Sequence, residues 1–259
     1  MSTERHRQLF TGTASYYSRF RPTYPPELFD LIAKTFGLDG KGRLLDLGCG
    51  PGNVFFGLHQ YFEEVVAVDI NAEMLIEARL RAENLGVKNL GLLEQPAEEI
   101  GPDLGSFRLV TMGRSFHWMN RELVIGKVWE LLETGGGIVL LGGDDSPQKP
   151  WLDFIVRGLV ERWRVRERLL ENDYKGRFEE FIGQSAFSDM QHGIVETEEE
   201  WGLEQIIGKT YSMSGSKPEL FGENREAFER ELRQALTLLE PSGRFVYRNA
   251  FGYVLAFKC

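Results

Sequence analysis

The residues best suited to chemistry form a glycine-rich turn, Asp46-Leu47-Gly48-Cys49-Gly50-Pro51-Gly52-Asn53. Glycines at alternate positions let the chain turn tightly and let a ligand approach the backbone closely. The third glycine falls one position too early for a dinucleotide-binding fingerprint, and the Gly-Lys-Ser/Thr ending of a phosphate-binding P-loop is absent. An acid before the turn would repel pyrophosphate and attract an ammonium or sulfonium group. The turn therefore predicts a cationic ligand without phosphate.

A second acid, Asp69, ends the apolar run that begins at Val65. A carboxylate at the end of the second strand of an α/β sheet can accept hydrogen bonds from both ribose hydroxyls of an adenosine. The alternative is a tight turn followed by an acid that caps a helix. The turn and the acid together, in one strand context, favour a ligand that contains a nucleoside.

The elements that must position these residues are short apolar runs separated by helical patterns. The runs are Arg43–Leu47, Val65–Asp69, Leu90–Glu94, Arg108–Met112 and Ile138–Leu141. They are apolar on both faces, which is typical of strands covered by helices on each side. Asn71 and Asn120 can cap two of the helices, and the second is expected to end at the glycines 135–137. This alternation predicts a Rossmann-like, doubly wound α/β fold.

The remaining segments complete one predicted domain over residues 1–259. We expect an N-terminal cap segment at 1–40, with a helix from Pro26 to Phe36, and a cofactor-binding core at 41–143. Residues 144–187 are expected to form an arginine-rich helical lid insertion. Residues 188–259 are expected to complete the sheet as strand, helix, helix and strand, because the last strand must return to the same sheet.

Composition excludes several classes of function. With 30 basic and 39 acidic residues, the formal net charge of −9 argues against binding a nucleic-acid backbone as the main function. Two cysteines cannot form a disulfide framework, which favours a cytoplasmic protein. No apolar stretch approaches the roughly 18 to 20 residues that span a bilayer, so no membrane association is expected. The four histidines lack metal-ligand spacing, so no metal site is predicted. The sequence does not indicate an oligomeric state.

The two acids and the turn between them resemble the first two motifs of the class I S-adenosylmethionine-dependent methyltransferases. Three further segments resemble the trans-aconitate methyltransferase-like subgroup of small-molecule enzymes. They are the lead-in Tyr17 to Pro25, the segment Ala97-Glu98-Glu99-Ile100, and Phe116-His117-Trp118-Met119-Asn120. The resemblance covers about residues 15–143. It implies a seven-stranded sheet whose last strand is antiparallel.

The resemblance also implies roles for individual residues in binding S-adenosylmethionine. Asp46 would neutralise the ammonium of the methionine moiety, and the backbone of Gly48, Cys49 and Gly50 would contact it. Asp69 would bind the ribose. The residues expected around the adenine and the methyl-donor centre are Ile70, Gln95, Ala97, Glu98 and Arg114. Many family members have Asp just before the Ala-Glu pair, where this chain has Pro96, so a side-chain acceptor for the adenine amino group must come from elsewhere.

The expected reaction depends mainly on placement, because a sulfonium methyl is already activated. A general base is needed only when the acceptor must lose a proton. His117 is the leading candidate base, since it follows the fourth predicted strand and an imidazole titrates near neutral pH. The alternative is a histidine that shapes the loop. Arg21 and Tyr17 are expected to hold an acidic acceptor, because arginine binds carboxylates in a bidentate fork. Their alternative role is an ordinary lead-in to a helix.

We therefore expect a methyltransferase that acts on a small-molecule substrate and releases S-adenosylhomocysteine. Two alternatives stay open at this point. One is a methyltransferase acting on protein or RNA, and the other is a non-catalytic S-adenosylmethionine-binding protein.

Overall fold

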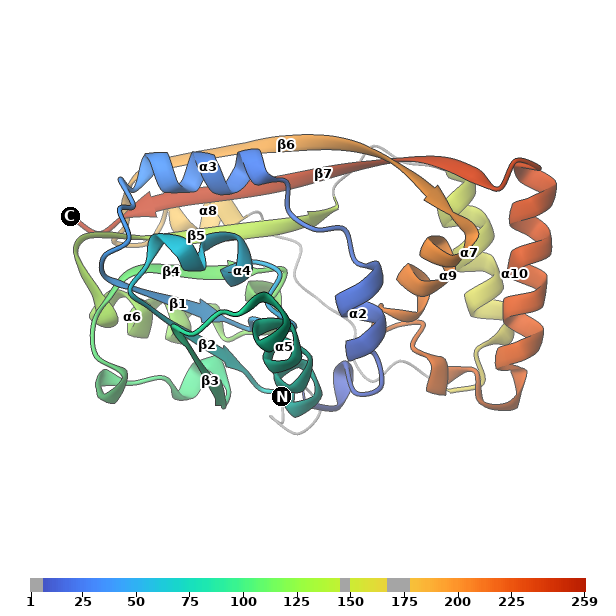
Figure 1. The fold of residues 1–259 in the computed structure, drawn as a ribbon, viewed down its shortest axis with the longest axis horizontal. Helices are drawn as coiled ribbons and strands as arrows, with labels where there is room; N and C mark the ends of the chain where they lie inside the picture. Colours follow the sequence, from blue (N-terminus) through green and yellow to red (C-terminus); the bar gives the residue numbers. More distant parts are fainter. Residues whose placement is uncertain (1–6, 145–149, 167–177) are drawn as a thin grey trace. The chain divides into compact units, whose positions relative to one another are not determined.

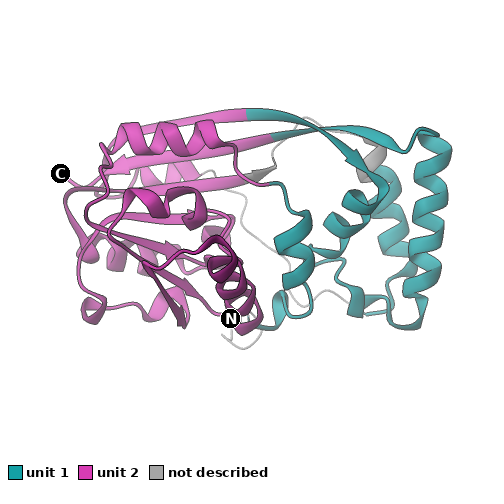
Figure 2. Ribbon diagram, in the orientation of Figure 1, with its two compact units in different colours: residues 1–22, 146–171, 196–249 teal, residues 23–145, 172–195, 250–259 magenta. Residues whose placement is uncertain are grey.

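The computed structural model describes residues 7–144, 150–166 and 178–259. Contacts divide the chain into two compact units, which are coloured separately in Figure 2. The sheet unit consists of Thr23–Asp145, Asn172–Val195 and Ala250–Cys259. The helical unit consists of Met1–Pro22, Ser146–Glu171 and Glu196–Asn249. Each unit is described by itself below.

Among the described residues, seven strands form one mixed sheet in the order β3-β2-β1-β4-β5-β7-β6 (Figure 1). The pairs β1–β2, β2–β3, β1–β4 and β4–β5 are parallel, whereas β7 runs antiparallel to β5. The strands are β1 Arg43–Leu47, β2 Glu64–Asp69, β3 Leu90–Glu94, β4 Phe107–Gly113, β5 Leu132–Asp144, β6 Ser188–Gly202 and β7 Arg244–Phe257. The predicted fold class, with its antiparallel last strand, is confirmed.

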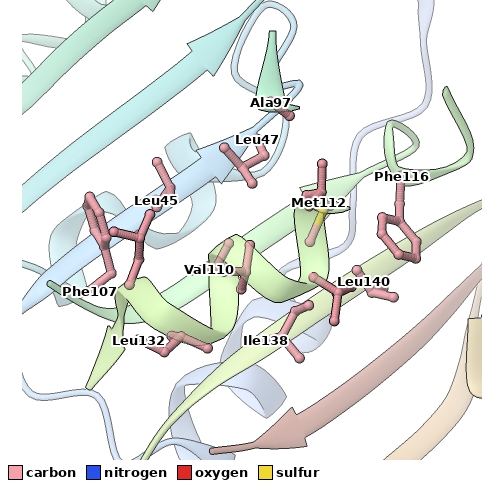
Figure 3. Close-up of a cluster of buried hydrophobic side chains, with 14 of the residues drawn as sticks. Leu45, Leu47, Ala97, Phe107, Val110, Met112, Phe116, Leu132, Ile138 and Leu140 are labelled. Atoms are coloured by element: carbon pink, nitrogen blue, oxygen red, sulfur yellow. The ribbon is translucent and has the colours of Figure 1, made fainter. Parts of the chain in front are cut away.

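Helices cover both faces of the sheet. Successive strand residues point to opposite faces, so the central strands contribute side chains to two buried clusters. On one face, Leu45, Leu47, Val110 and Met112 belong to a buried cluster with side chains of α6 (Arg121–Leu131) (Figure 3). The short helix α8 (Phe178–Ile182) adds Ile182 to this cluster. On the other face, a second cluster joins the sheet to α3 (Pro26–Thr35), α4 (Phe55–Leu58) and α5 (Ala72–Leu85). The apolar runs of β1, β2, β4 and β5 are therefore strands buried on both sides, as the sequence predicted, whereas the edge strand β3 is only half-buried.

The predicted starts of two helices are confirmed, but one predicted helix end is wrong. The side chain of Asn71 accepts a hydrogen bond from the Met74 amide at 3.1 Å, and that of Asn120 accepts one from the Leu123 amide at 3.3 Å. The helix α6 does not reach the glycines 135–137; it ends at Leu131, and β5 begins at Leu132. These glycines instead let β5 approach its neighbours closely, since a Cβ on Gly137 would collide with Phe36 and with the Ala256 carbonyl.

Short 3₁₀ helices connect several elements. One of them follows α4, which ends at Leu58, so that the helical segment after the glycine turn finishes as a 3₁₀ turn. The 3₁₀ helices are His59–Tyr61, Ala97–Glu99, Pro102–Leu104, Phe116–Trp118, Pro218–Leu220 and Gly222–Asn224.

The helical unit is built from α2 (Ala14–Phe20), α7 (Pro150–Trp163), α9 (Leu203–Tyr211) and α10 (Arg225–Leu239). Its core contains Phe221, Phe228 and Tyr211, all nearly fully buried. The helices α2 and α9 cross closely, because a Cβ on Gly208 would collide with the ring of Phe20. None of the helices in the described parts of the chain is both long enough and apolar enough to cross a membrane.

The predicted segments contribute to both units. The N-terminal segment 1–40 supplies α2 to the helical unit and α3 to the sheet unit. The predicted lid insertion 144–187 supplies α7 to the helical unit and α8 to the sheet unit, and its residues 145–149 and 167–177 lie outside the described residues. The single domain over 1–259 and the lid role stay predictions.

Candidate functional site

The glycine turn follows β1, which lies beside β4 in the sheet. The chain after β1 forms α4 on one face of the sheet, whereas the chain after β4 forms α6 on the other face. Open α/β sheets bind ligands at such a switch point, outside the carboxyl ends of the strands. Gly48 and Gly50 have φ of +62° and +54°, a conformation that L side chains rarely adopt. A Cβ on Gly48 would collide with Ser115, whose hydroxyl donates to the Leu47 carbonyl at 2.7 Å. A Cβ on Gly50 would meet no atom of the described residues within 4 Å, so this glycine presents an open backbone face to them.

Asp69 fixes the turn through backbone hydrogen bonds. Its Oδ2 accepts from the Gly50 amide and its Oδ1 from the Asn71 amide, both at 2.8 Å. The residue is 9% exposed, and burial raises the pKa of its carboxyl above the usual value, while these amides oppose the shift. Because a carboxylate oxygen can accept more than one hydrogen bond, both oxygens keep capacity for a ligand hydroxyl.

Asp46 lies fully buried beside the turn. Its Oδ1 accepts a hydrogen bond from the Thr111 hydroxyl at 2.7 Å, whereas its Oδ2 has no hydrogen-bond partner among the described residues. Burial raises the pKa of the Asp46 carboxyl to about 7, and the negative charge of Asp69 adds to the rise. The hydroxyl of Thr111 opposes it, and so does the polar amide of Phe55, which lies outside hydrogen-bond geometry. A buried carboxyl with an unsatisfied oxygen is costly, and a cationic ligand would offset that cost.

The residues predicted around the adenine cluster after β2 and β3. The Gln95 amide donates to the Asp69 carbonyl at 3.1 Å, and Ala97 is buried in the core. Ile70 follows Asp69 and is half-buried. The carboxylate of Glu98 accepts from the Asn120 amide at 2.8 Å, so it joins the segment after β3 to the start of α6. That hydrogen bond occupies one of the two carboxylate oxygens of Glu98.

Arg114 and His117 follow β4 at the same edge of the sheet. Arg114 has φ of +53°, and its guanidinium lies 5.0 Å from the ring centre of Tyr24 and 5.5 Å from that of Phe251. Left-handed backbone at a residue other than glycine is strained and is concentrated at functional sites. His117 is half-buried in a 3₁₀ turn, with its ring centre 4.9 Å from that of Trp118.

Tyr17 and Arg21 belong to the helical unit. The Arg21 guanidinium lies 5.0 Å from the Tyr17 ring centre, and its Nη2 donates to the Ser212 carbonyl at 3.4 Å. The structure thus groups the other predicted site residues in the sheet unit and these two in the helical unit. Their contribution to a shared site stays a prediction.

Sequence reasoning missed residues that hold the turn from a distance. Arg81, on α5, donates through Nη1 to the Pro51 carbonyl at 2.6 Å and to Asn53 Oδ1 at 3.0 Å. Thr111 binds Asp46 from β4. Neither carries a local sequence signal, because each contact depends on packing between separate elements. Cys49 is buried, and burial raises the pKa of its thiol well above the usual value, which suits a packing role.

The described residues contain no group of three or more His, Cys, Asp or Glu side chains that could hold a metal ion. Both cysteines are free, Cys49 buried and Cys259 exposed.

Comparison with known proteins relates the residues around this site to methyltransferases. Residues 44–136 match the family model described as a methyltransferase domain. An uncharacterized methyltransferase of Schizosaccharomyces pombe is 24% identical over 85% of this chain and 84% of its own length. An uncharacterized methyltransferase of Mycobacterium tuberculosis is 32% identical, over 55% of each chain.

A solved structure is available for another of the similar proteins. YcgJ of Bacillus subtilis, an uncharacterized methyltransferase, is 27% identical over 70% of this chain and 72% of its own length. Its crystal structure superposes with a TM-score of 0.56 over 90% of this chain and 98% of that one, at 19% identity, and this likeness shows the shared fold. The matched domain begins with β1 and covers the glycine turn, Asp69 and His117. Residues 44–136 therefore match a methyltransferase domain, within a chain that has the fold of these methyltransferases.

Proposed function

We propose that this chain binds S-adenosylmethionine at the glycine turn and transfers its methyl group to a small-molecule acceptor, with S-adenosylhomocysteine as the second product. The observation that carries the proposal is the open backbone face of Gly50, whose amide is held by Asp69. A ligand can approach the backbone there without displacing a side chain, while the acid that fixes the turn keeps acceptor capacity for ribose hydroxyls.

The residues present fit the cofactor chemically. Asp46 offers a buried carboxylate oxygen to which none of the described residues donates a hydrogen bond, and a ligand ammonium or sulfonium would compensate its charge. When bound, S-adenosylmethionine supplies a methyl group on a positively charged sulfur, which needs no further activation. The adenine would lie along Ile70, Gln95 and Ala97, with Glu98 keeping one oxygen on the Asn120 amide.

The reaction then needs the acceptor to be held in line, which in well-oriented systems accounts for several kcal/mol of rate acceleration. We assign to His117 the removal of a proton from acceptors that must lose one, and to Arg114 the border of the methyl-donor centre. Arg21 and Tyr17 are the proposed anchors for an acidic acceptor. The net charge of −9 favours a small acceptor over RNA, and the two free cysteines favour the cytoplasm.

A matched pair of glycine variants tests the cofactor site. Gly50→Ala and Gly37→Ala introduce the same methyl group at nearly the same φ, +54° and +56°, and neither new Cβ meets an atom within 4 Å. Both should therefore cost similar stability, about 1–2 kcal/mol. Only Gly50→Ala should weaken binding of S-adenosylhomocysteine, as measured by titration calorimetry.

Equal affinity of the two variants would contradict the proposed site. Turnover is measured as release of S-adenosylhomocysteine with a panel of acidic, phenolic and amine acceptors. Binding without turnover on any of them would favour a non-catalytic binding protein, whereas turnover only on protein or RNA would replace the small-molecule assignment.

A further inference from the structure

The segment after the glycine turn lacks the support that a long helix gives in dinucleotide-binding folds. The helix α4 has four residues, Phe55–Leu58, and passes into a 3₁₀ turn. Backbone hydrogen bonds within the segment run from Gly52 to the Cys49 carbonyl at 3.0 Å, from Phe56 to the Gly52 carbonyl at 3.2 Å and from Gly57 to the Val54 carbonyl at 3.0 Å. The Cys49 amide also donates to the Val68 carbonyl of β2 at 3.0 Å, whereas none of these bonds is donated by Pro51 or Asn53. Loop positions held by few backbone hydrogen bonds are easily displaced unless side chains hold them.

Arg81 supplies such a hold from the neighbouring helix α5. Its Nη1 donates to the Pro51 carbonyl and to Asn53 Oδ1, and its guanidinium lies 4.8 Å from the ring centre of Phe56. One cation therefore engages a carbonyl, a side-chain oxygen and an aromatic ring of residues 51–56. Hydrogen bonds from a charged donor are about twice as strong as neutral ones, and partial burial shields this one from solvent.

The same helix is tied to the other side of the turn. At its start, the amide of Asn71 donates to Asp69 Oδ1, while Asp69 Oδ2 accepts from the Gly50 amide. The chain thus connects α5 to the turn at two points, at Gly50 through Asp69 and at 51–53 through Arg81. Two attachments on one helix fix both the position and the tilt of the turn.

We propose that Arg81 is a positioning residue for the cofactor, holding residues 51–53 so that the open face of Gly50 stays in register with Asp69. The inference rests on the proposed function, since it names a residue that prepares the same site. Arg81 touches the turn and not the reacting atoms, so its loss should act on cofactor binding more than on the rate of the saturated enzyme.

Three variants separate this role from simple packing. Arg81→Met keeps the length of the side chain and removes its donors, and Arg81→Lys restores a charged donor. Arg79→Met is the matched control, because Arg79 is exposed on the same helix. Arg81→Met should raise the Kd for S-adenosylhomocysteine and the KM for S-adenosylmethionine about tenfold, the scale of one lost charged hydrogen bond. The kcat should change less than threefold, Arg81→Lys should recover part of the loss, and Arg79→Met should match the wild type.

Amide hydrogen exchange of the ligand-free protein tests the hold without the cofactor. In Arg81→Met, the amides of Gly52 and Phe56 should exchange at least tenfold faster than in the wild type and in Arg79→Met. If the wild type bound no S-adenosylhomocysteine, the proposed function would fail, while this exchange would still decide whether Arg81 holds the turn. Unchanged exchange in Arg81→Met would overturn the inference.

A second variant covers the case in which Arg81→Met does not fold. Asn53→Ala removes one acceptor of Arg81 at a half-buried position, and it should raise the Kd severalfold. In the double variant its effect should be absent, because residues that share one interaction are not additive. Wild-type affinity in Asn53→Ala, or full additivity in the double variant, would equally overturn the inference.

Discussion

Raising the pH from 6 to 8 should strengthen cofactor binding, because Asp46 changes charge within this range. Its carboxyl is fully buried, one oxygen has no hydrogen-bond partner among the described residues, and burial raises its pKa to about 7. A ligand ammonium or sulfonium close to this carboxyl attracts only the ionised form. The affinity should therefore follow the ionised fraction of Asp46 in the free protein.

The magnitude follows from that pKa. A carboxyl with a pKa of about 7 is about 9% ionised at pH 6 and about 91% at pH 8. If only the ionised form binds, the association constant rises about tenfold across this range, or about 1.4 kcal/mol. Bound cofactor would also lower the pKa of Asp46, so that binding near pH 7 releases a fraction of a proton.

Titration calorimetry measures both effects. The Kd for S-adenosylmethionine is determined at pH 6, 7 and 8, and buffers with different heats of ionisation count the protons released. Asp46→Asn keeps the size and the acceptor for Thr111 but removes the charge. The affinity of this variant should therefore be lower than that of the wild type at pH 8, and its Kd should be nearly independent of pH. The reasoning fails if the wild-type Kd changes less than twofold between pH 6 and 8, or if the variant shows the same dependence.

The Asp46 carboxyl should also make the protein less stable as the pH rises. Its pKa in the folded state lies above the ordinary aspartate value, so the native state binds more protons than the unfolded state. The stability that this proton binding contributes is complete below the unfolded pKa and is lost as the pH passes through about 7. Urea unfolding should therefore show wild type losing stability relative to Asp46→Asn between pH 5 and 8, and parallel pH profiles would contradict this. His117→Ala should lower kcat by 10²–10⁴ on acceptors that must lose a proton, with the Kd for S-adenosylhomocysteine unchanged; normal turnover at saturating acceptor would leave His117 as a loop-shaping residue. Arg21→Ala should raise the KM of carboxylate acceptors and spare neutral ones, and steady-state kinetics showing the same KM for both classes would remove Arg21 from the acceptor site.

The fold was predictable where the determining signal is local. Short runs that are apolar on both faces give the strands, and Asn71 and Asn120 begin the helices predicted from them. The end of α6 was not predictable, because a residue far along the chain satisfies it. The Lys258 ammonium donates to the Trp129 and Leu132 carbonyls at 2.6 and 2.7 Å. No pattern within residues 121–137 contains that contact.

The site divides in the same way. The positive φ of Gly48 and Gly50 follows from residue type and turn geometry, so the turn could be found from sequence. The charge state of Asp46 depends on burial and on Thr111 from another strand, and the bond from Asn120 to Glu98 depends on how α6 meets the segment after β3. Such properties arise from tertiary packing, and only the structure supplies them.

The division of the chain into two units predicts that cofactor affinity and acceptor affinity depend on different residues. The glycine turn, Asp69 and Arg81 all lie in the sheet unit, whereas Arg21 and Tyr17 lie in the helical unit, held to α9 through the Ser212 carbonyl and the close crossing of α2. Residues that share a partner couple, whereas residues without shared partners are nearly additive. Variants at the turn should therefore move cofactor affinity, variants at Arg21 should move acceptor affinity, and double variants across the units should show little coupling in the Kd for S-adenosylhomocysteine. A strong coupling in that Kd would mean that the helical unit takes part in cofactor binding itself, and Arg21 would then belong with the residues of the turn.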